Sequence, residues 1–255
     1  MAILALDIGN TSASLGLYKG ERLVSYFRRP TNKVLSFMLD SRFPACRQAR
    51  CGNDKENLDG IIISSVVPSL DAKISATLKK KFKIKPVFIT HKNSGIKIGY
   101  PKPKEIGADR LADAVAAWER YKKACIIVDF GTATTLDYID SSGFYRGGPI
   151  APGIIVANEA LYMSAAKLPR AKVRPTQKMI PSSTVQAMQS GIYQGYIGLV
   201  ERLVKMTAEE VGGRPKIIAT GGLSPLIKKG TGIFDAVDPL LTLKGLQIIW
   251  SKLNS

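Results

Sequence analysis

The chain is poor in histidine and cysteine. Among 255 residues it has one histidine and three cysteines. A single histidine, His91, argues against a metal site with several histidine ligands and against a Ser-His-Asp triad, and we expect it in a surface loop. The three cysteines, Cys46, Cys51 and Cys125, lack the spacing of a metal site. We predict that Cys125 is a small core residue. Cys46 and Cys51 could pair, although a cytosolic location argues against a structural disulfide.

Long hydrophobic runs are also missing. The longest apolar stretches, such as residues 60–67 and 126–128, are much shorter than the roughly 20 residues that a membrane-spanning helix needs. The N-terminus has no basic segment, and Asp7 interrupts its apolar run, so no signal peptide is recognisable. We therefore predict a cytoplasmic protein without membrane association.

Acidic residues are in the minority. The sequence has 37 Lys and Arg against 20 Asp and Glu, which gives a formal net charge of +17. Such a charge attracts anions, including nucleotides and nucleic acids. Basic residues cluster around residues 79–85 and 167–178, but no RNP-type aromatic pattern or zinc-finger spacing accompanies them. We favour a solvated basic surface and do not expect a nucleic-acid partner.

The remaining composition is that of a soluble globular protein, with 45% apolar and 22% charged residues. Predicted strands at residues 60–67 and 86–89 alternate with predicted helices at residues 32–42 and 70–81. This alternation indicates an α/β fold with a parallel or mixed sheet and crossover helices.

Residues 106–135 contain two acids beside groups suited to phosphate. Gly107-Ala108-Asp109-Arg110 stands at a predicted helix start, and residues 125–128 form a β-branched run typical of a buried strand. That strand leads into Asp129-Phe130-Gly131-Thr132-Ala133-Thr134-Thr135. Two acids from two elements suggest a phosphoryl-transfer site.

The N-terminus has a similar pattern. A predicted strand at residues 2–6 is followed by Asp7-Ile8-Gly9-Asn10-Thr11-Ser12 and by a second strand. The tip of such a hairpin can present backbone N–H groups to a phosphate while Asp7 holds Mg²⁺. An ordinary hairpin with Gly-Asn turn chemistry is the alternative, and these residues alone leave both open.

The second half of the chain therefore opens as the first does: strand, Asp-x-Gly, strand, turn, strand. We predict two similar lobes, residues 1–120 and 121–255, with a cleft between them. A long helix is predicted over residues 185–211, capped by Ser183-Thr184, with Gly191, Gly195 and Gly198 on one side. A strand at residues 216–220 ends in Gly221-Gly222, where a nucleotide could approach the backbone.

Taken in order, these motifs resemble the type III pantothenate kinases, a branch of the actin/hexokinase/Hsp70-like phosphotransferase superfamily. The resemblance covers nearly the whole chain, and GADR followed by DFGTATT is its most specific part. It implies duplicated actin/ribonuclease H-like lobes, each a mixed central sheet flanked by helices, with a nucleotide cleft between them. The motifs that carry it are Asp7-x-Gly9-Asn10-Thr11, Tyr100, Gly107-Ala108-Asp109-Arg110, Asp129-x-Gly131-Thr132-Ala133-x-Thr135, Gly147-Gly148-x-Ile150-x-Pro152-Gly153, Thr184, Thr220-Gly221-Gly222 and Leu241-Thr242-Leu243-x-Gly245-Leu246.

The resemblance implies transfer of the ATP γ-phosphate to the terminal hydroxyl of pantothenate, the first step of coenzyme A biosynthesis. It assigns Asp109 as the general base and Asp129 as the ligand of a K⁺ or NH₄⁺ ion, and it places Asp7 near the Mg²⁺ that accompanies ATP. It also implies a homodimer. The expected ATP contacts are Asp7, Ile8, Gly9, Asn10, Thr11, Ser12, Ala13, Ser14, Thr132, Gly221 and Gly222. The expected pantothenate contacts are Tyr100, Gly107, Ala108, Asp109, Arg110 and Thr184.

Some assignments have structural alternatives. Asp109 could cap the helix that we expect to begin near Arg110, Arg110 could form a surface salt bridge with Asp113, and threonine hydroxyls could satisfy Asp129 without an ion.

The chain also departs from the family on the acceptor side. Lys102 stands where the family has asparagine, and Pro181-Ser182-Ser183 stands where it has Gly-Lys-Asp or similar residues. A non-catalytic accessory or regulatory protein of this fold, and a kinase with another small hydroxylated acceptor, are therefore the competing hypotheses.

Overall fold

The computed structural model describes residues 1–40, 43 and 58–255. Cys46, Cys51 and nearly all of the loop predicted over residues 43–58 lie outside these residues. The chain divides into two compact units, one made of residues 1–116 and 241–255 and the other of residues 117–240. The division thus falls within α4 (Ala108–Tyr121), close to the predicted boundary at residue 120. Residues 241–255, which we had placed in the second lobe, belong to the first unit.

The first unit contains a mixed five-stranded sheet with the order β3-β2-β1-β4-β5. The first three strands are antiparallel, and β1 pairs in parallel with β4, as β4 does with β5. The strands of this sheet are β1 (Ala2–Ile8), β2 (Ser12–Lys19), β3 (Arg22–Pro30), β4 (Gly60–Ser65) and β5 (Val87–Phe88), and the short strand β6 (Lys97–Ile98) is not part of it. The helices of this unit, apart from the start of α4, are η1 (Thr31–Lys33), α1 (Val34–Leu39), α3 (Pro68–Phe82), η2 (Pro103–Glu105) and α8 (Leu241–Leu253).

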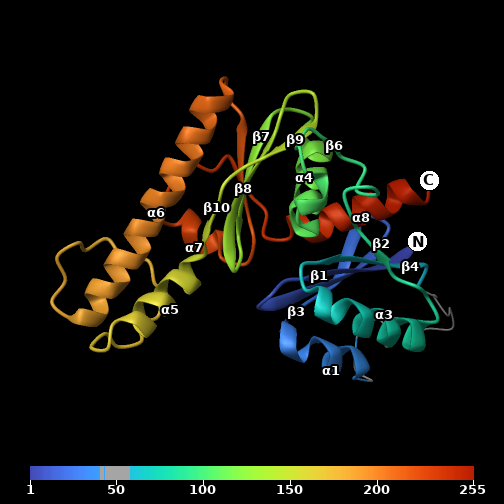
Figure 1. Ribbon diagram of the computed structural model, residues 1–255, viewed down its shortest axis with the longest axis horizontal. Coiled ribbons are helices and arrows are strands. Elements are labelled where there is room, and N and C mark those ends of the chain that lie inside the picture. Colours follow the sequence, from blue (N-terminus) through green and yellow to red (C-terminus); the bar gives the residue numbers. More distant parts are fainter. Residues whose placement is uncertain (41–42, 44–57) are drawn as a thin grey trace. The chain divides into compact units, whose positions relative to one another are not determined.

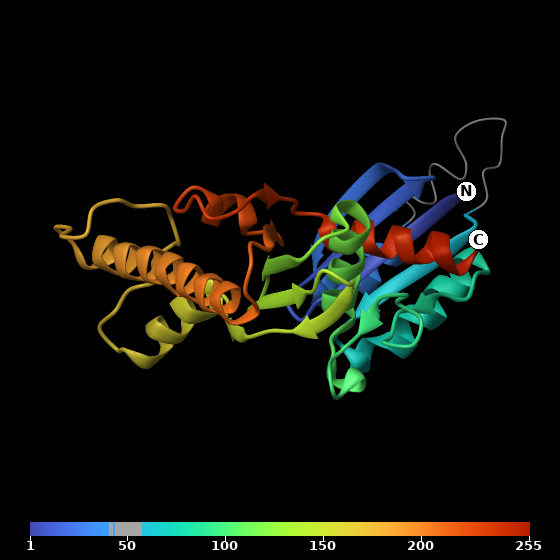
Figure 2. The same ribbon diagram turned by 90° about the horizontal axis from the view of Figure 1, so that it is seen from above.

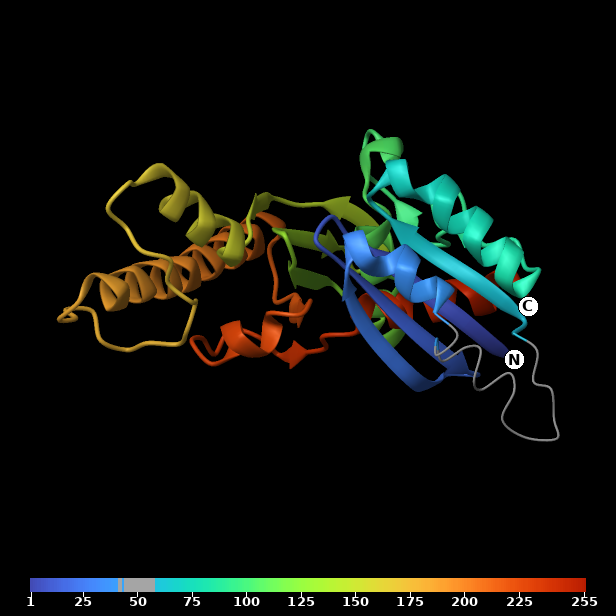
Figure 3. The same cartoon turned by 90° about the horizontal axis from the view of Figure 1, so that it is seen from below.

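Helices cover both faces of this sheet. The helices α1 and α3 lie against one face, as Figures 1 and 3 show, and their residues Val34, Met38 and Ile74 share a buried cluster with Leu6 and Ile63. Every second residue of β1 and β4, such as Leu6 and Ile63, points into this cluster.

The helix α8 crosses the other face (Figure 2). A Cβ atom on Gly60 would lie 1.9 Å from the Trp250 ring, and one on Gly245 would lie 1.9 Å from the Ala112 carbonyl oxygen. Glycine at both positions therefore allows α8 to pack close to β4 and to the first part of α4.

The second unit repeats the topology. Its main strands have the order β9-β8-β7-β11-β12, which matches β3-β2-β1-β4-β5 strand for strand, including the parallel pairs β7–β11 and β11–β12. This order confirms the predicted duplication of a mixed sheet flanked by helices. The elements are β7 (Cys125–Phe130), β8 (Ala133–Ile139), β9 (Phe144–Gly147), β10 (Ile150–Pro152), α5 (Ile154–Ser164), α6 (Thr184–Val211), β11 (Lys216–Thr220), α7 (Ser224–Lys228) and β12 (Ala236–Val237).

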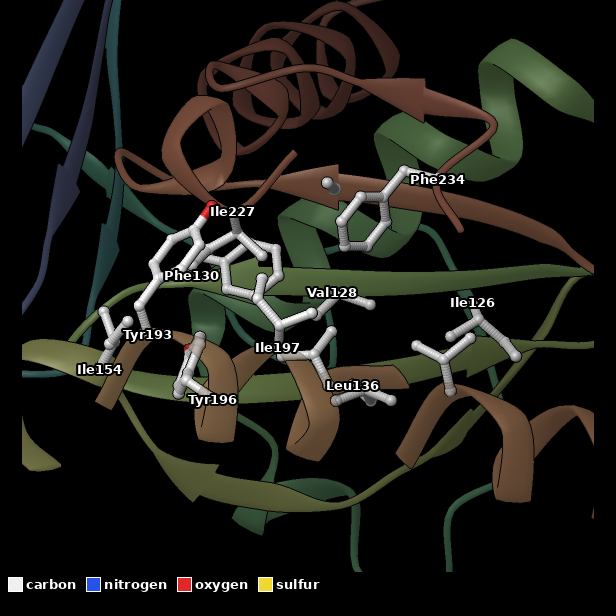
Figure 4. Packing of buried hydrophobic residues seen from close by; sticks show 13 residues of the cluster. Ile126, Val128, Phe130, Leu136, Ile154, Tyr193, Tyr196, Ile197, Ile227 and Phe234 are labelled. Carbon is white, nitrogen blue, oxygen red and sulfur yellow. The ribbon is translucent and has the colours of Figure 1, made fainter. Parts of the chain in front are cut away.

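The long helix α6 supplies much of the core of this unit. Tyr193, Ile197 and Val200 pack against alternate residues of β7, among them Val128 and Phe130 (Figure 4). The opposite face of β7 carries Cys125, Ile127 and Asp129. Cys125 is fully buried, as predicted, and burial raises the pKa of its thiol to about 11.

Candidate active site

The loop between β1 and β2 turns tightly at Gly9. The Gly9 N–H donates to the Ser12 carbonyl oxygen at 3.1 Å, and a Cβ on Gly9 would lie 3.0 Å from that oxygen. Asn10 and Thr11 are exposed at the tip, whereas Ala13 is buried. The predicted hairpin is therefore present, and its polar tip is open to solvent.

Two residues near the end of β3 hold this loop, and sequence reasoning missed both. The Thr31 hydroxyl donates to the Gly9 carbonyl oxygen at 2.6 Å, and the Thr31 N–H donates to the Thr11 carbonyl oxygen at 3.0 Å. The Arg28 Nε and Nη2 atoms both donate to the Ser12 hydroxyl, at 3.1 and 2.9 Å. No sequence pattern marks Arg28 or Thr31, because a lone arginine or threonine in a strand is common.

Asp7 stands near the carboxyl end of β1, beside the parallel strand β4. It is paired with Ser64, and the Val66 N–H donates to the Ile8 carbonyl oxygen at 3.1 Å. In open α/β sheets, ligands bind just beyond the carboxyl ends of parallel strands. The end of β1 and β4 is therefore the expected place for a ligand in this unit.

Asp109 reaches the same end of the sheet. A Cβ on Gly107 would lie 2.5 Å from Asp109 Oδ1 and 3.7 Å from Val66 Cγ1, so the carboxylate folds over Gly107 beside the residue that follows β4. Only glycine leaves room for this arrangement. Asp109 and Asp7 thus belong to one unit. Asp7 is near the carboxyl end of β1, and Asp109 lies beside the residue that follows β4.

The helix α4 begins at Ala108, two residues before Arg110, so Asp109 is in its first turn and is not the capping residue. Its Oδ1 atom accepts a hydrogen bond from the Arg110 N–H at 2.8 Å. A carboxylate here satisfies a free N–H group and interacts favourably with the helix dipole. This structural role holds the carboxylate in place and is compatible with a chemical one.

Burial raises the pKa of the Asp109 carboxyl. The hydrogen bond from the Arg110 N–H and the positive charge of Arg110 lower the pKa, but the effect of burial is larger. A carboxylate with a raised pKa is a better proton acceptor near neutral pH.

The residues before GADR lie in the same unit. Tyr100 is half-buried, and Lys102 is exposed, with its Nζ atom 3.2 Å from Glu105 Oε1. The lysine that replaces the family asparagine is therefore held by an acid three residues further on.

The corresponding loop of the second unit joins β7 to β8. The Gly131 N–H donates to the Ala133 carbonyl oxygen at 3.1 Å, and the Gly153 N–H donates to the Thr132 carbonyl oxygen at 3.1 Å. A Cβ on Gly153 would lie 2.4 Å from that carbonyl oxygen. Thr132 is exposed at the tip of the loop.

Asp129 lies between two glycines of this unit. A Cβ on Gly221 would lie 2.3 Å from Asp129 Oδ1, and one on Gly131 would lie 3.6 Å from Oδ2. Thr220 is paired with Asp129, and its buried hydroxyl has no hydrogen-bond partner among the described residues. The structure therefore brings Asp129, Thr132 and Gly221 together, with the exposed Gly222 next in the chain.

Thr184 lies on another element, as the exposed first residue of α6. The Ser183 hydroxyl caps this helix by accepting from the Gln186 N–H at 3.4 Å.

Sequence reasoning also missed Asp137, which is fully buried and accepts a hydrogen bond from the Tyr145 hydroxyl at 2.6 Å. Its position eight residues after Asp129, within a predicted strand, gave no sign of this pairing.

In the described part of the chain, no three His, Cys, Asp or Glu side chains are grouped so as to hold a metal ion, and no helix is long and apolar enough to cross a membrane.

Comparison with solved structures supports the actin-like fold. A Campylobacter jejuni protein, provisionally described as a Baf family transcriptional activator, aligns with a TM-score of 0.62 and 21% identity over 98% of both chains. The activator of 2-hydroxyisocaproyl-CoA dehydratase from Clostridium difficile, with bound ADPNP, aligns with a TM-score of 0.55 and 10% identity over 100% of this chain and 96% of that one. At these identities the likeness concerns the fold alone.

Comparison of sequences is more specific. The type III pantothenate kinase family matches residues 3–206. A type III pantothenate kinase of Koribacter versatilis is 42% identical over 99% of this chain and 96% of its own length. The resemblance inferred from the motifs is confirmed: the chain belongs to the type III pantothenate kinases and is a phosphotransferase.

Proposed function

We propose that this protein transfers the γ-phosphate of ATP to the terminal hydroxyl of pantothenate, with Asp109 as the general base. The observation that carries the proposal is the position of Asp109. Its carboxylate lies over Gly107 beside the end of β4, in the unit that also contains the β1–β2 loop. Phosphoryl transfer depends mainly on alignment and charge neutralisation. A fixed carboxylate that orients the attacking hydroxyl and accepts its proton meets that need.

The phosphates of the nucleotide would bind at the β1–β2 loop of the first unit. Residues 7–14 offer backbone N–H groups and hydroxyls to the phosphates, and Asp7 would contact the accompanying Mg²⁺. Mg²⁺ usually keeps several water ligands and takes only one or two carboxylates beside the phosphates, so one aspartate suffices. The family resemblance adds Thr132, Gly221 and Gly222, in and near the β7–β8 loop, to the expected ATP contacts.

Pantothenate would bind around the start of α4. Arg110 can donate to its carboxylate in a forked geometry that lysine cannot copy. Gly107 and Ala108 leave room beside Asp109, and Tyr100 and Thr184 would complete the contacts. Lys102 and residues 181–183 are exposed, except for the half-buried Pro181, so their departures from the family pattern would change acceptor affinity more than the phosphate chemistry.

A monovalent cation, K⁺ or NH₄⁺, would bind at Asp129. The buried Thr220 hydroxyl beside it supports this assignment, because a buried hydroxyl normally has a polar partner. The cation would supply fixed positive charge near the phosphates, and Asp129 and Thr220 would hold it in place.

The protein would act as a homodimer in the cytoplasm. A Cβ atom on Gly191, Gly195 or Gly198 of α6 would meet nothing within 4 Å, so no part of the chain that the structure describes uses the close packing that these glycines permit. Ile155 and Met163 of α5 are exposed at 46% and 80%. Light scattering coupled to size-exclusion chromatography would give the oligomeric state.

The decisive experiment is an acceptor panel. Purified protein is supplied with MgATP and with pantothenate or other small hydroxylated acids and sugars, in K⁺, NH₄⁺ or Na⁺ buffers. We expect 4′-phosphopantothenate to form in K⁺ or NH₄⁺, and we expect Asp109→Asn to lower kcat by about 10²- to 10⁴-fold, the usual contribution of general-base catalysis.

Glu105→Gln is the matched control, because it removes one exposed negative charge near GADR without touching Gly107 or Asp109. Absence of product from pantothenate with either cation would refute the proposal. Turnover of a different acceptor would favour a related kinase, and no turnover of any acceptor would favour an accessory protein.

A further inference from the structure

Four polar residues form a row across four neighbouring strands of the first sheet. Arg28 on β3 is paired with Ser14 on β2. Asp7 on β1 is paired with Ser14 on one side and with Ser64 on the other. Residues paired in this way point to the same face of a sheet, so these four, which we call the polar row, share a face. It is the face opposite the buried cluster that contains Leu6 and Ile63.

The buried end of the polar row is Ser64. This residue is 0% exposed, and its hydroxyl has no hydrogen-bond partner among the described residues. Buried hydroxyls are normally hydrogen-bonded, so this one indicates that a polar ligand completes the row beside Asp7.

Arg28 is the exposed, cationic end of the row. Its Nε and Nη2 atoms are both directed at the single hydroxyl of Ser12, in the loop between β1 and β2. These two atoms form the side of the guanidinium group that matches two phosphate oxygens. A neutral hydroxyl is a weaker partner for this fork than a phosphate, so an arriving anion would compete well for Arg28.

We propose that Arg28 is a phosphate-binding residue of the nucleotide site, which releases Ser12 and donates through Nε and Nη2 to the terminal phosphates of bound MgATP. This inference rests on the proposed nucleotide site in the β1–β2 loop. It adds a contact from β3, outside that loop. The competing explanation is structural: Arg28 ties β3 to Ser12 and has no contact with the nucleotide.

The first test is equilibrium binding, by calorimetry, of MgATP, MgADP and adenosine in the absence of any acceptor. Because a hydrogen bond to a charged group contributes about 1.5–3 kcal/mol, we expect Arg28→Gln to weaken MgATP binding by about 10- to 100-fold. Arg28→Lys, which keeps the charge and loses the fork, is expected to give a smaller loss. Adenosine affinity is expected to stay unchanged.

Arg22→Gln is the matched control. Arg22 is exposed at the other end of β3, paired with Lys19, and its substitution makes the same charge change away from the loop. We expect Arg22→Gln to alter MgATP affinity by less than about twofold, since exposed charges at a distance are screened by salt. Equal MgATP affinities for Arg28→Gln and Arg22→Gln would overturn the inference. Thermal melting of each variant verifies that it is folded.

A double-mutant cycle separates phosphate binding from loop tethering. If Arg28 acted only through Ser12, Arg28→Gln would cause no further loss of MgATP affinity in a Ser12→Ala background. We expect a further loss of about tenfold or more, because the arginine would still contact the phosphates.

The inference and the proposed function can fail separately. A wild type that binds MgATP through Arg28 but makes no 4′-phosphopantothenate supports the inference and refutes the acceptor assignment. A wild type that makes product, with the same KM for ATP in Arg28→Gln and Arg22→Gln, refutes the inference alone. No binding of MgATP to the wild type would overturn both.

Discussion

The β1–β2 loop and the β7–β8 loop occupy the same place in two sheets of the same strand order. In both, a glycine stands two residues after an aspartate. The first loop is held by side chains: Arg28 of β3 and Thr31 of η1 hydrogen-bond to it. The second is enclosed by backbone, with Gly153 against Thr132 and Gly221 against Asp129. The two loops therefore follow the same backbone path but are stabilised by different groups.

This difference predicts different tolerance to change. A loop held by side-chain hydrogen bonds can exchange its partners when a ligand binds, and losing one bond has a moderate cost. A loop enclosed by glycine backbone has no spare space, so even a methyl group displaces the carboxylate. The first loop can therefore change its hydrogen bonds more easily, as the proposed nucleotide site requires, whereas the second holds Asp129 in a fixed position.

The largest effect is expected for Gly221→Ala. Gly221 has φ +84°, and its new Cβ would lie 2.3 Å from Asp129 Oδ1 and 2.8 Å from the Phe130 backbone nitrogen and oxygen. Backbone strain and overpacking together are expected to lower the free energy of unfolding by about 2–5 kcal/mol. Urea titration followed by circular dichroism measures this loss.

Two control variants separate the contribution of backbone strain from that of overpacking. Gly20→Ala has a similar φ of +58° but open space within 4 Å, so it measures backbone strain alone. Gly9→Ala in the first loop has a φ outside the left-handed region and a contact of 3.0 Å, so it is expected to cost about 1 kcal/mol or less. If Gly221→Ala cost no more than Gly20→Ala, the second loop would not be enclosed as described.

A moderate effect is expected for Thr31→Val in the first loop. Thr31 is 7% exposed, and valine removes the hydroxyl that donates to Gly9 while keeping the shape of the side chain. The loss of a buried hydrogen bond is expected to cost about 1–2 kcal/mol in the free energy of unfolding. Thr31→Ser, which keeps the hydroxyl, serves as the control. Equal unfolding free energies for the valine and serine variants would show that the Thr31 hydroxyl does not hold the loop in this way.

The smallest effect, opposite in sign, is expected for Asp109→Asn, which lies outside both loops. Because burial raises the Asp109 pKa in the folded protein, its contribution to stability is complete below the unfolded pKa and is lost as the pH rises through the folded pKa. Asparagine stays neutral throughout. We therefore expect the variant to melt at a higher temperature than the wild type at pH 7, with the difference shrinking as the pH falls toward 4.

Thermal scans from pH 4 to 8 measure this difference, and in a chain of this size 1 kcal/mol corresponds to about 2–4 °C. Glu105→Gln, which removes an exposed charge, is expected to show no such pH dependence. A lower melting temperature for Asp109→Asn at neutral pH would mean that the carboxylate stabilises the start of α4 more than its burial costs.

The repeat was predictable from the sequence because it depends on local patterns. Short apolar runs at residues 2–6, 60–67 and 125–128 gave β1, β4 and β7, and Ser183 marked the start of α6. The two Asp-x-Gly turns follow from the same local chemistry, since a polar tip between two strands needs a glycine and short polar side chains.

Contacts between distant residues were not predictable in this way. Local sequence does not show which sheet a helix covers, so residues 241–255 were placed in the second lobe, whereas they belong to the first unit. Arg28 and Thr31 gave no signal because their partners are backbone and hydroxyl groups about 16 to 22 residues away. The unpartnered hydroxyls of Ser64 and Thr220 became visible only once burial was known.

The place of α8 also bears on the order in which the molecule can be assembled during synthesis. Chains emerge from the ribosome N-terminus first, and early segments generally fold as soon as their contacts are available. Here Trp250 covers Gly60, and Gly245 packs on Ala112, so the first sheet receives α8 only after the whole second unit has been synthesised. The sheet that bears Asp7 and Arg28 would therefore lack this helix for most of synthesis, and a release of the chain before residue 241 would leave it without α8.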